Sequence, residues 1–199
     1  ADQAIGLLKA QPNAHPSVDS LRALAARVDA DAPGVLTVLY SGPVGTGVWS
    51  TDVVTSMVER GDDVRVINRS EAARFLESRE FLKAVAAAHG IDPELLRRGD
   101  YSGPATDWLH HPTDGPWADA SARFADATVG EVRAIVSHAQ PNRVFGEIEL
   151  PRILANPNVT TIEGIPREAL VGVKSRVGQL AAFELIVARA HENVGTLRI

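Results

Sequence analysis

The segment 117–150 constrains the fold of this chain more than any other part of the sequence. Pro116 can open a helix there, because a proline in the first helical turn gives up no intrahelical hydrogen bond. Trp117, Ser121 and Phe124 follow at i, i+4 and i+7, which places them on one face of that helix. The sequence therefore predicts a helix that presents an indole and a hydroxyl on the same side.

A strand and a pair of glutamates follow this helix. The apolar run Val132–His138 indicates a buried strand, and the turn 139–142 leads from it to Phe145. Glu147 and Glu149 then alternate along what we expect to be an extended segment, so that one of them faces solvent. An aromatic ring, a hydroxyl and a carboxylate are thus predicted toward one end of a strand. That set suits a site that holds a flat ring and stabilises a nearby positive charge.

The remaining apolar runs indicate the fold class. Val35–Tyr40 is short and continuously apolar, as expected of a strand covered on both faces. Residues 64–67 suggest a short extended piece, and strands over 159–162 and 196–199 flank an amphipathic helix over 174–191. Strand, helix and strand in that order imply parallel pairing with a right-handed crossover. We expect an α/β fold, with a helical N-terminal half packed on a C-terminal half that has a short, mainly parallel sheet.

Helices dominate the rest of the N-terminal half. Apolar spacing and capping residues predict helices over 3–10, 16–28, 50–59 and 70–88, and a short one opened by Asp92 and Pro93. Residues 99–116 indicate a long functional loop over the core. For 199 residues we expect a single catalytic domain with two lobes and a cleft between them: about 1–34 and 48–128 mainly helical, about 35–47 and 129–199 α/β.

A glycine-rich loop over 41–47 has two interpretations. It is either a plain strand-to-helix turn or a loop whose backbone N–H groups contact a pyrophosphate. The loop lacks the Gly-Lys-Ser/Thr of a phosphate-binding loop, and its Gly-x-x-Gly-x-Gly order is not the dinucleotide fingerprint. The sequence leaves both interpretations open.

Composition excludes several classes of function. The 25 acidic residues outnumber the 20 basic ones, and no basic run occurs, which argues against nucleic-acid binding. No apolar run approaches the ~20 residues of a membrane span. The chain has no cysteine, so it has no thiol chemistry and no cysteine-based zinc site. His110 and His111 suggest no metal site, because adjacent histidines point apart and no third ligand is suitably spaced.

The pattern Trp117-x-x-x-Ser121-x-Arg123-Phe124-Ala125, then a strand, then Phe145-Gly146-x-x-Glu149 resembles the ADP-ribosyl cyclase family. These enzymes cleave the nicotinamide bond of NAD. The likeness extends from Ala14 to Ile199, and Tyr40-Ser41 stands where the family has tryptophan followed by serine in its first strand.

The resemblance implies a role for each matching residue. Glu149 corresponds to the catalytic carboxylate and Ser121 to the serine near the ribose. Trp117 and Tyr40 correspond to the two aromatic walls of the nicotinamide-ribose pocket. The acid that contacts the nicotinamide amide is either Glu71 or Glu77, and Ser41 and Phe145 complete the implied substrate-binding set.

Three departures from the family pattern bear on substrate preference and on cyclisation. The animal members have several disulfides, and this chain has none. Gly42 stands where the family has arginine, so phosphate binding must come from elsewhere. One aromatic wall is Tyr40 rather than tryptophan.

These residue types suit the cleavage of NAD(P)+. An O-glycoside needs a second carboxyl group to protonate its leaving oxygen. The nicotinamide ring, in contrast, is already cationic and leaves as a neutral molecule. One carboxylate then suffices to stabilise the positive charge on the ribose, and aromatic walls hold the cationic ring. Capture by water gives ADP-ribose, and capture by the adenine gives the cyclic product. NAD+ or NADP+ is the substrate, and no cofactor is expected.

Two other functions stay open. Glu147-x-Glu149 matches the Glu-x-Glu of protein mono-ADP-ribosyltransferase toxins, although no Arg plus Ser-Thr-Ser strand precedes it. A non-catalytic nucleotide-binding module would bind NAD without consuming it. The chain starts at Ala1 without methionine or a secretory signal, which fits a toxin domain cut from a larger effector, acting in a target-cell cytosol and needing a cognate inhibitor (immunity) protein.

Overall fold

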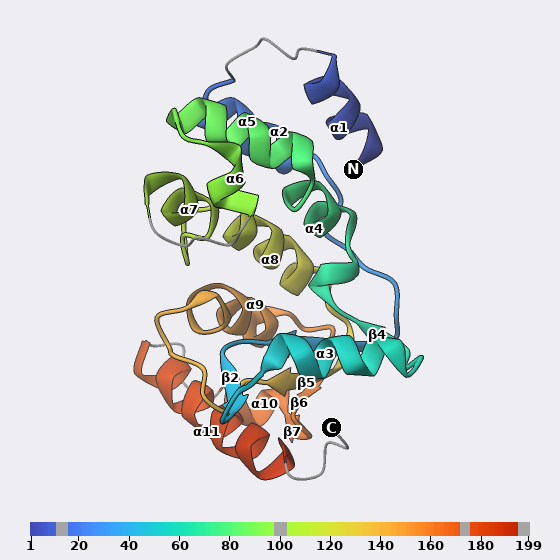
Figure 1. Cartoon of the computed structure of the whole chain (residues 1–199). Coiled ribbons are helices and arrows are strands. Elements are labelled where there is room, and N and C mark those ends of the chain that lie inside the picture. The colour runs from blue at the N-terminus through green and yellow to red at the C-terminus, as the bar shows by residue number, and fades with distance from the viewer. Residues whose placement is uncertain (11–15, 98–102, 172–175, 195–199) are drawn as a thin grey trace. The chain divides into compact units, whose positions relative to one another are not determined.

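The computed structural model describes residues 1–10, 16–97, 103–171 and 176–194. The chain divides into two compact units (Figure 1). Unit 1 comprises 1–32 and 67–123, and unit 2 comprises 33–66 and 124–199. The segment 48–66, which we expected in the helical lobe, belongs to unit 2 because its helix packs on the first strand.

Unit 1 is built from helices. They are α1 (Asp2–Lys9), α2 (Val18–Ala25), the 3₁₀ turn η1 (Ile67–Arg69), α4 (Glu71–Leu76), α5 (Arg79–His89), α6 (Pro93–Arg97), α7 (Pro104–Leu109) and α8 (Pro116–Asp126), whose last residues belong to unit 2. The serine hydroxyls of Ser17, Ser70 and Ser78 cap α2, α4 and α5 by accepting backbone N–H groups at 3.2, 3.0 and 3.2 Å.

Two expectations for unit 1 were wrong in detail. The helix predicted over 70–88 is two helices, because Ser78 ends the first segment and caps α5. Gly90 ends α5 in the left-handed region at φ 66°, where glycine carries no steric penalty. The stretch 99–116, predicted as a loop, contains α7, with a proline in its first turn. The first four residues of that stretch lie outside the described ranges.

Unit 2 contains a five-stranded sheet in the order β4-β1-β5-β6-β7. The strands are β1 (Leu36–Tyr40), β4 (Val64–Arg65), β5 (Gly130–Ile135), β6 (Val159–Ile162) and β7 (Ile165–Pro166). The first four pair in parallel, and β7 pairs with β6 antiparallel. The α/β class and the mainly parallel sheet are confirmed.

The crossover differs from the one we predicted. The parallel pair β5 and β6 is joined through the π-helical turn η2 (Phe145–Glu149) and α9 (Leu150–Ala155). After β6 the chain turns back into β7, then α10 (Arg167–Leu170) and α11 (Arg176–Val194). The strand predicted over 196–199 lies outside the described residues.

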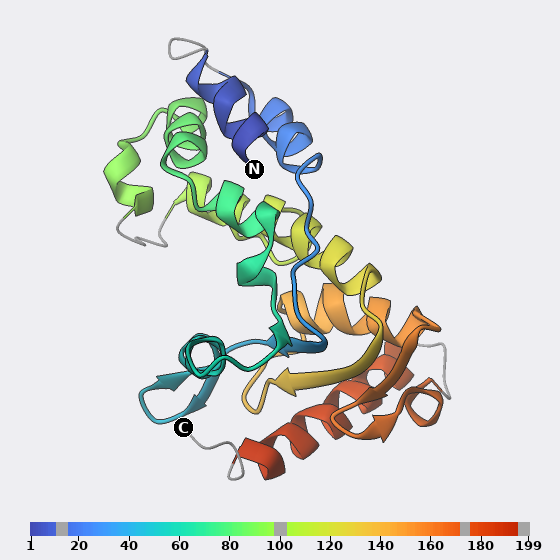
Figure 2. The same cartoon turned by 90° about the vertical axis from the view of Figure 1, so that its right-hand side faces the viewer.

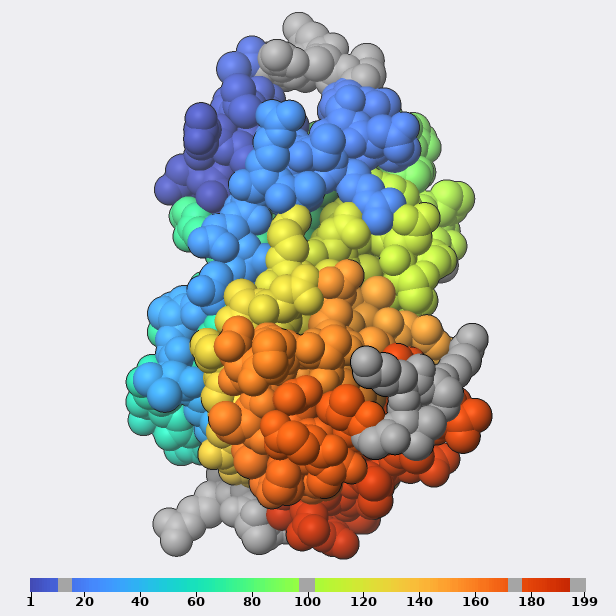
Figure 3. Space-filling model, turned by 180° about the vertical axis from the view of Figure 1, so that it is seen from behind, coloured from blue at the N-terminus to red at the C-terminus, as the bar shows by residue number. Residues whose placement is uncertain are grey.

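Helices complete the core of unit 2. The helix α3 (Ser50–Glu59) packs on β1, and α11 packs on β5, alongside which it runs in Figure 2. The core on the α3 side consists of buried aliphatic residues: Val38, Val44, Val53, Val54, Met57, Val64, Val66 and Ile135. In Figure 3 the orange and red residues of the carboxyl-terminal third form one continuous surface.

The glycine-rich loop 41–47 is not a plain strand-to-helix turn, and the pyrophosphate contact remains a prediction. It forms a small antiparallel hairpin of β2 (Pro43–Gly45) and β3 (Val48–Trp49), which leads into α3. Val44 is buried in the core described above, which ties the hairpin to the sheet. The Asp52 carboxylate accepts the Trp49 N–H at 3.0 Å and so satisfies a backbone donor at the start of α3.

Candidate functional site

The Phe-Gly-x-x-Glu motif forms a π-helical turn rather than the extended segment we predicted. The Leu150 N–H donates to the Phe145 carbonyl, five residues back, and the helix continues as α9. Single π turns inside α-helices are rare and are frequent at functional sites. The motif's glutamate is the last residue of this turn.

The backbone packed against residue 146 explains why this position needs glycine. A Cβ atom at this position would lie 2.2 Å from the Pro141 carbonyl oxygen and 2.8 Å from the Pro141 carbonyl carbon. Real Cβ contacts of that length do not occur, and the contacting atoms belong to the backbone. The close approach of the 139–142 turn therefore sets the path of the chain into η2.

The two glutamates of the motif have opposite environments. Glu149 is 5% exposed, whereas Glu147 is exposed to solvent. A buried carboxylate is costly to desolvate, so it is retained only where it is well satisfied or has a function. The alternation we predicted for an extended segment thus arises from a helical turn, and the buried member is the one that matches the family motif.

Phe145 anchors the turn in the core. Its side chain is fully buried, and its ring centroid lies 5.8 Å from that of Phe183 on α11, at an interplanar angle of 45°. Tilted aromatic pairs at this separation stabilise packing by about 0.5–1.5 kcal/mol beyond their burial. The ring is enclosed by protein in this structure. The substrate contact that the resemblance implies for Phe145 remains a prediction.

Tyr40 and Ser41 lie at the carboxyl end of β1. Tyr40 pairs with Ile135 of β5, and the Ser41 N–H donates to the Ile135 carbonyl at 3.1 Å. The Tyr40 ring is partly buried and packs against the α3 side of the core. In open parallel sheets, ligands bind outside the carboxyl ends of the strands, which is where these two residues are.

Gly42 has a structural reason to be glycine. Its φ is +75°, in the left-handed region, and a Cβ would lie 3.3 Å from the His138 carbonyl oxygen. An arginine at this position, as in the family that the sequence resembles, would be strained in this backbone conformation. Phosphate binding through a side chain at residue 42 is therefore absent.

Ser137 is a candidate that the sequence analysis missed. It lies two residues after the end of β5, is 5% exposed, and its Oγ has no hydrogen-bond partner among the described residues. A buried hydroxyl without a partner costs about 1–3 kcal/mol. The available signal was a hydroxyl residue just after a buried parallel strand, which we included in the predicted strand 132–138 instead.

Trp117 and Ser121 lie on α8 in unit 1, as predicted. Trp117 is partly exposed, Ser121 is 6% exposed and Phe124 is fully buried. The arginine of the motif has a structural role, because its guanidinium donates to the carbonyls of the residues that end α2: Ala25, Ala26 and Val28, at 3.4, 2.9 and 3.3 Å. Burial lowers the pKa of Arg123, although the group stays protonated at pH 7.

The two candidate acids for the nicotinamide amide occupy the two ends of α4. Glu71, in the first turn, accepts hydrogen bonds from the Ala1 ammonium at 2.8 Å and from Arg74 at 2.6 Å, and these bonds lower its pKa. Glu77, at the C-cap, has its pKa raised by desolvation although its surface is exposed. Both Glu71 and Glu77 remain candidates for the contact with the nicotinamide amide.

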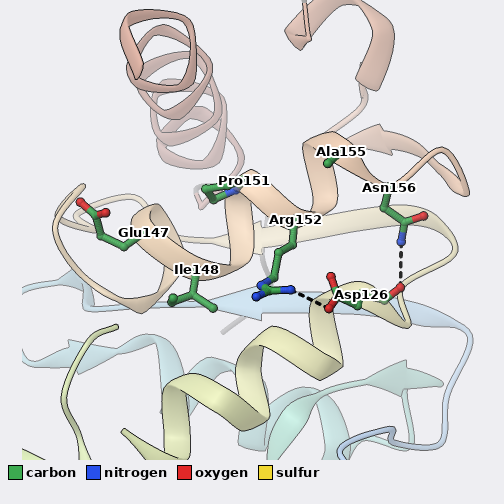
Figure 4. Close-up of a pocket in the computed structure, with 7 residues that line it drawn as sticks. All are labelled: Asp126, Glu147, Ile148, Pro151, Arg152, Ala155 and Asn156. Atoms are coloured by element: carbon green, nitrogen blue, oxygen red, sulfur yellow. Dashed lines mark hydrogen bonds and ion pairs between the residues drawn. The ribbon is translucent and has the colours of Figure 1, made fainter. Parts of the chain in front are cut away.

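A pocket of about 500 Å³ lies along η2 and α9, beside Asp126 at the end of α8 (Figure 4). Its lining residues are Asp126, Glu147, Ile148, Pro151, Arg152, Ala155 and Asn156. Arg152 forms an ion pair with Asp126 at 2.6 Å, and the Asn156 amide donates to the Asp126 carbonyl at 3.1 Å. Glu147 is among the residues that line this pocket, and Glu149 is not.

The predicted site residues divide between the two units. Unit 2 contains Tyr40 and Ser41 at the end of β1, and Phe145 and Glu149 on one turn. Unit 1 contains the remaining four: Trp117, Ser121, Glu71 and Glu77. Among the described residues, no group of three or more His, Asp or Glu side chains could hold a metal ion. None of the helices in the described ranges is long and apolar enough to cross a membrane.

Comparison of the chain with known proteins gave no match to a family model, to a curated protein or to a solved structure.

Proposed function

We propose that this protein cleaves the nicotinamide–ribose bond of NAD(P)+ and releases nicotinamide and ADP-ribose, with cyclic ADP-ribose as a second product. The proposal includes an ADP-ribosyl cyclase-like fold. The observation that carries it is Glu149, a carboxylate that is 5% exposed and held on the π-helical turn of Phe145–Glu149. The steric requirement for Gly146 in the same turn supports it, because both residues belong to the motif.

Burial suits Glu149 to the charge that forms in this reaction. When the cationic pyridine ring leaves as neutral nicotinamide, the positive charge passes to the ribose. A fixed carboxylate shielded from water stabilises that charge more strongly than an exposed one, because the local dielectric is lower. The reaction requires no proton from the protein for the leaving group, so one carboxylate is sufficient.

The other matched residues have supporting roles in this proposal. Trp117 and Tyr40 hold the pyridine ring, and Ser121 hydrogen-bonds the ribose. Glu71 or Glu77 contacts the carboxamide. Water that reaches the ribosyl intermediate gives ADP-ribose, and the ratio of the linear to the cyclic product depends on how well the site excludes it.

The test pairs two neighbouring carboxylates. Purified protein is mixed with NAD+ or NADP+, and nicotinamide and ribosyl products are followed by chromatography. Glu149→Gln should lower turnover at least ~10²-fold, the scale of removing a main electrostatic stabiliser. Glu147→Gln is the matched control, because it makes the same change on the exposed side of the turn, and it should leave turnover within about twofold. Equal activity of wild type and Glu149→Gln would refute the proposal.

A protein ADP-ribosyltransferase is the alternative. In that interpretation Glu147, which is exposed, would steer the acceptor protein, and Glu149, which is buried, would perform catalysis. Incubation with tagged NAD separates the two, since labelled protein bands indicate transfer and free ADP-ribose indicates hydrolysis. Binding of NAD without consumption would identify a nucleotide-binding module.

The proposal extends to an NAD-depleting toxin domain with a cognate inhibitor protein. Expression in a bacterial cytosol should lower the NAD pool and arrest growth, and Glu149→Gln should relieve both effects. Growth arrest that persists with an intact NAD pool would contradict this extension and leave the enzymatic test unaffected.

A further inference from the structure

The indole of Trp117 has an aromatic neighbour that neither the motif nor the resemblance includes. The His110 imidazole lies with its centroid 6.4 Å from that of the Trp117 ring, and the two planes are within 11° of parallel. This is an offset stack, one of the two preferred arrangements of aromatic pairs. His110 is exposed and Trp117 is partly exposed, so the pair is accessible from solvent.

The segment that joins the two rings is tightly built. A Cβ at Gly115 would lie 2.5 Å from the Trp108 carbonyl oxygen, so the chain folds back closely on the end of α7. The His111 Nδ1 accepts the Asp114 N–H at 3.0 Å. The two adjacent histidines therefore make different contacts: His111 closes the turn, and His110 stacks on the indole.

An ion pair fixes this turn to the rest of unit 1. The Arg22 guanidinium of α2 donates to Asp114 in the turn and to both carboxylate oxygens of Asp119 on α8, the latter at 2.6 and 2.9 Å. Asp119 and Trp117 are two residues apart on the same helix. The Arg22 ion pairs therefore hold the backbone just before and just after Trp117.

The imidazole is suited to lie beside a binding site for a cation. Desolvation lowers the pKa of His110 although part of its surface is exposed, so the ring is neutral at pH 7. A neutral ring adds no repulsion toward a pyridinium, and its polarisable face keeps the indole plane in place.

From this geometry we propose that His110 is a positioning residue of the nicotinamide-binding site: its stack fixes the plane of the Trp117 indole, and the cationic pyridine ring of the substrate lies against that indole. The inference rests on the function proposed above. It adds a specific requirement at a position outside the family motif, namely a flat ring at residue 110.

Steady-state kinetics with NAD+ test this requirement. A stack of this kind corresponds to about 0.5–1.5 kcal/mol, so His110→Ala should raise KM by about 2- to 10-fold and leave kcat within about twofold. His110→Phe restores a flat ring and should restore KM. His191→Ala, at an exposed histidine of α11 in unit 2, is the control and should change neither constant. Equal KM values for wild type and His110→Ala would overturn the inference.

Binding of the 1-methylnicotinamide cation, followed by NMR, gives a readout independent of turnover. The indole N–H signal of Trp117 is assigned by its loss in Trp117→Phe. The cation should shift this signal in wild type and His110→Phe, and more weakly in His110→Ala. If Glu149→Gln loses turnover while all residue-110 variants bind alike, the inference fails and the function stands. If the cation shifts Trp117 with the predicted dependence but NAD+ is not cleaved, only the function fails. No shift in wild type overturns the inference in either case.

Discussion

Gly146→Ala tests whether the π-helical turn positions Glu149. The added Cβ would lie 2.2 Å from the Pro141 carbonyl oxygen and 2.8 Å from both the carbonyl carbon and the Cα of Pro141. Ordinary contact begins at about 3.4 Å, so the two segments must separate by about 1 Å. All three contacted atoms are backbone, which cannot rotate away as a flexible side chain can.

We expect this substitution to affect both stability and turnover. Adding a carbon atom to a well-packed region lowers the free energy of unfolding by about 1–3 kcal/mol. Because the contacted atoms are rigid backbone, we expect Gly146→Ala to be at the upper end of that range. A displacement of about 1 Å at a catalytic group costs on the order of 10²-fold in rate. Turnover should therefore fall about 10²-fold at temperatures where the variant is still folded.

Gly45→Ala is the matched control within unit 2, because a Cβ at Gly45 meets nothing within 4 Å and its φ is not in the left-handed region. Urea unfolding measures the free energy of unfolding of each variant, and nicotinamide release measures turnover. If Gly146→Ala is as stable and as active as Gly45→Ala, then the close approach of Pro141 does not set the position of Glu149, and the structural basis of the proposed function is refuted.

Three further predictions concern single polar side chains. Ser137→Ala should leave the free energy of unfolding unchanged or raise it by up to about 1 kcal/mol, because the hydroxyl has no partner to lose; urea unfolding that shows a loss above about 1 kcal/mol would contradict this. Glu163→Ala should cost about 2 kcal/mol by urea unfolding, because the buried Glu163 carboxylate accepts the Ala134 N–H where β6 ends; an unchanged midpoint would count against it. Desolvation raises the pKa of Glu77, so its ionisation opposes folding, and the contribution of this group to stability should fall as pH rises from the unfolded pKa of about 4.3 through the raised folded pKa. Glu71 and Asp114, whose pKa values are lowered by hydrogen bonds, change stability in the opposite direction, and they are present in both wild type and the Glu77 variant. Glu77→Gln should remove that fall, and Tm values parallel to wild type from pH 3 to 7 would argue against it.

Much of the candidate site could be predicted from local sequence. The face shared by Trp117, Ser121 and Phe124 follows from helical periodicity, and α8 begins at Pro116 as predicted. The strands β1, β5 and β6 also follow from short apolar runs. These features depend on residues within about ten positions of one another, so the sequence pattern contains them directly.

The hairpin β2–β3, the break between α4 and α5 and the antiparallel β7 could not be predicted in the same way. Each depends on a choice between two locally acceptable conformations. Val44 packing in the α3-side core favours a hairpin over a simple turn, and the Ser78 hydroxyl favours a new helix start over a continuous helix. Periodicity alone does not distinguish these alternatives.

The sequence by itself determined which residues form α8, the helix that carries Trp117, and which apolar segments form the parallel strands β1, β5 and β6. It also determined that a glycine and two glutamates follow β5. Only the tertiary structure decided that the glutamates lie on a π-helical turn, with Glu149 buried and Glu147 exposed. The turn is fixed by the Pro141 carbonyl against Gly146 and by Phe183 against Phe145, 38 residues apart in sequence. Such contacts arise from packing between separate elements, and they have no signal within the five residues of the turn.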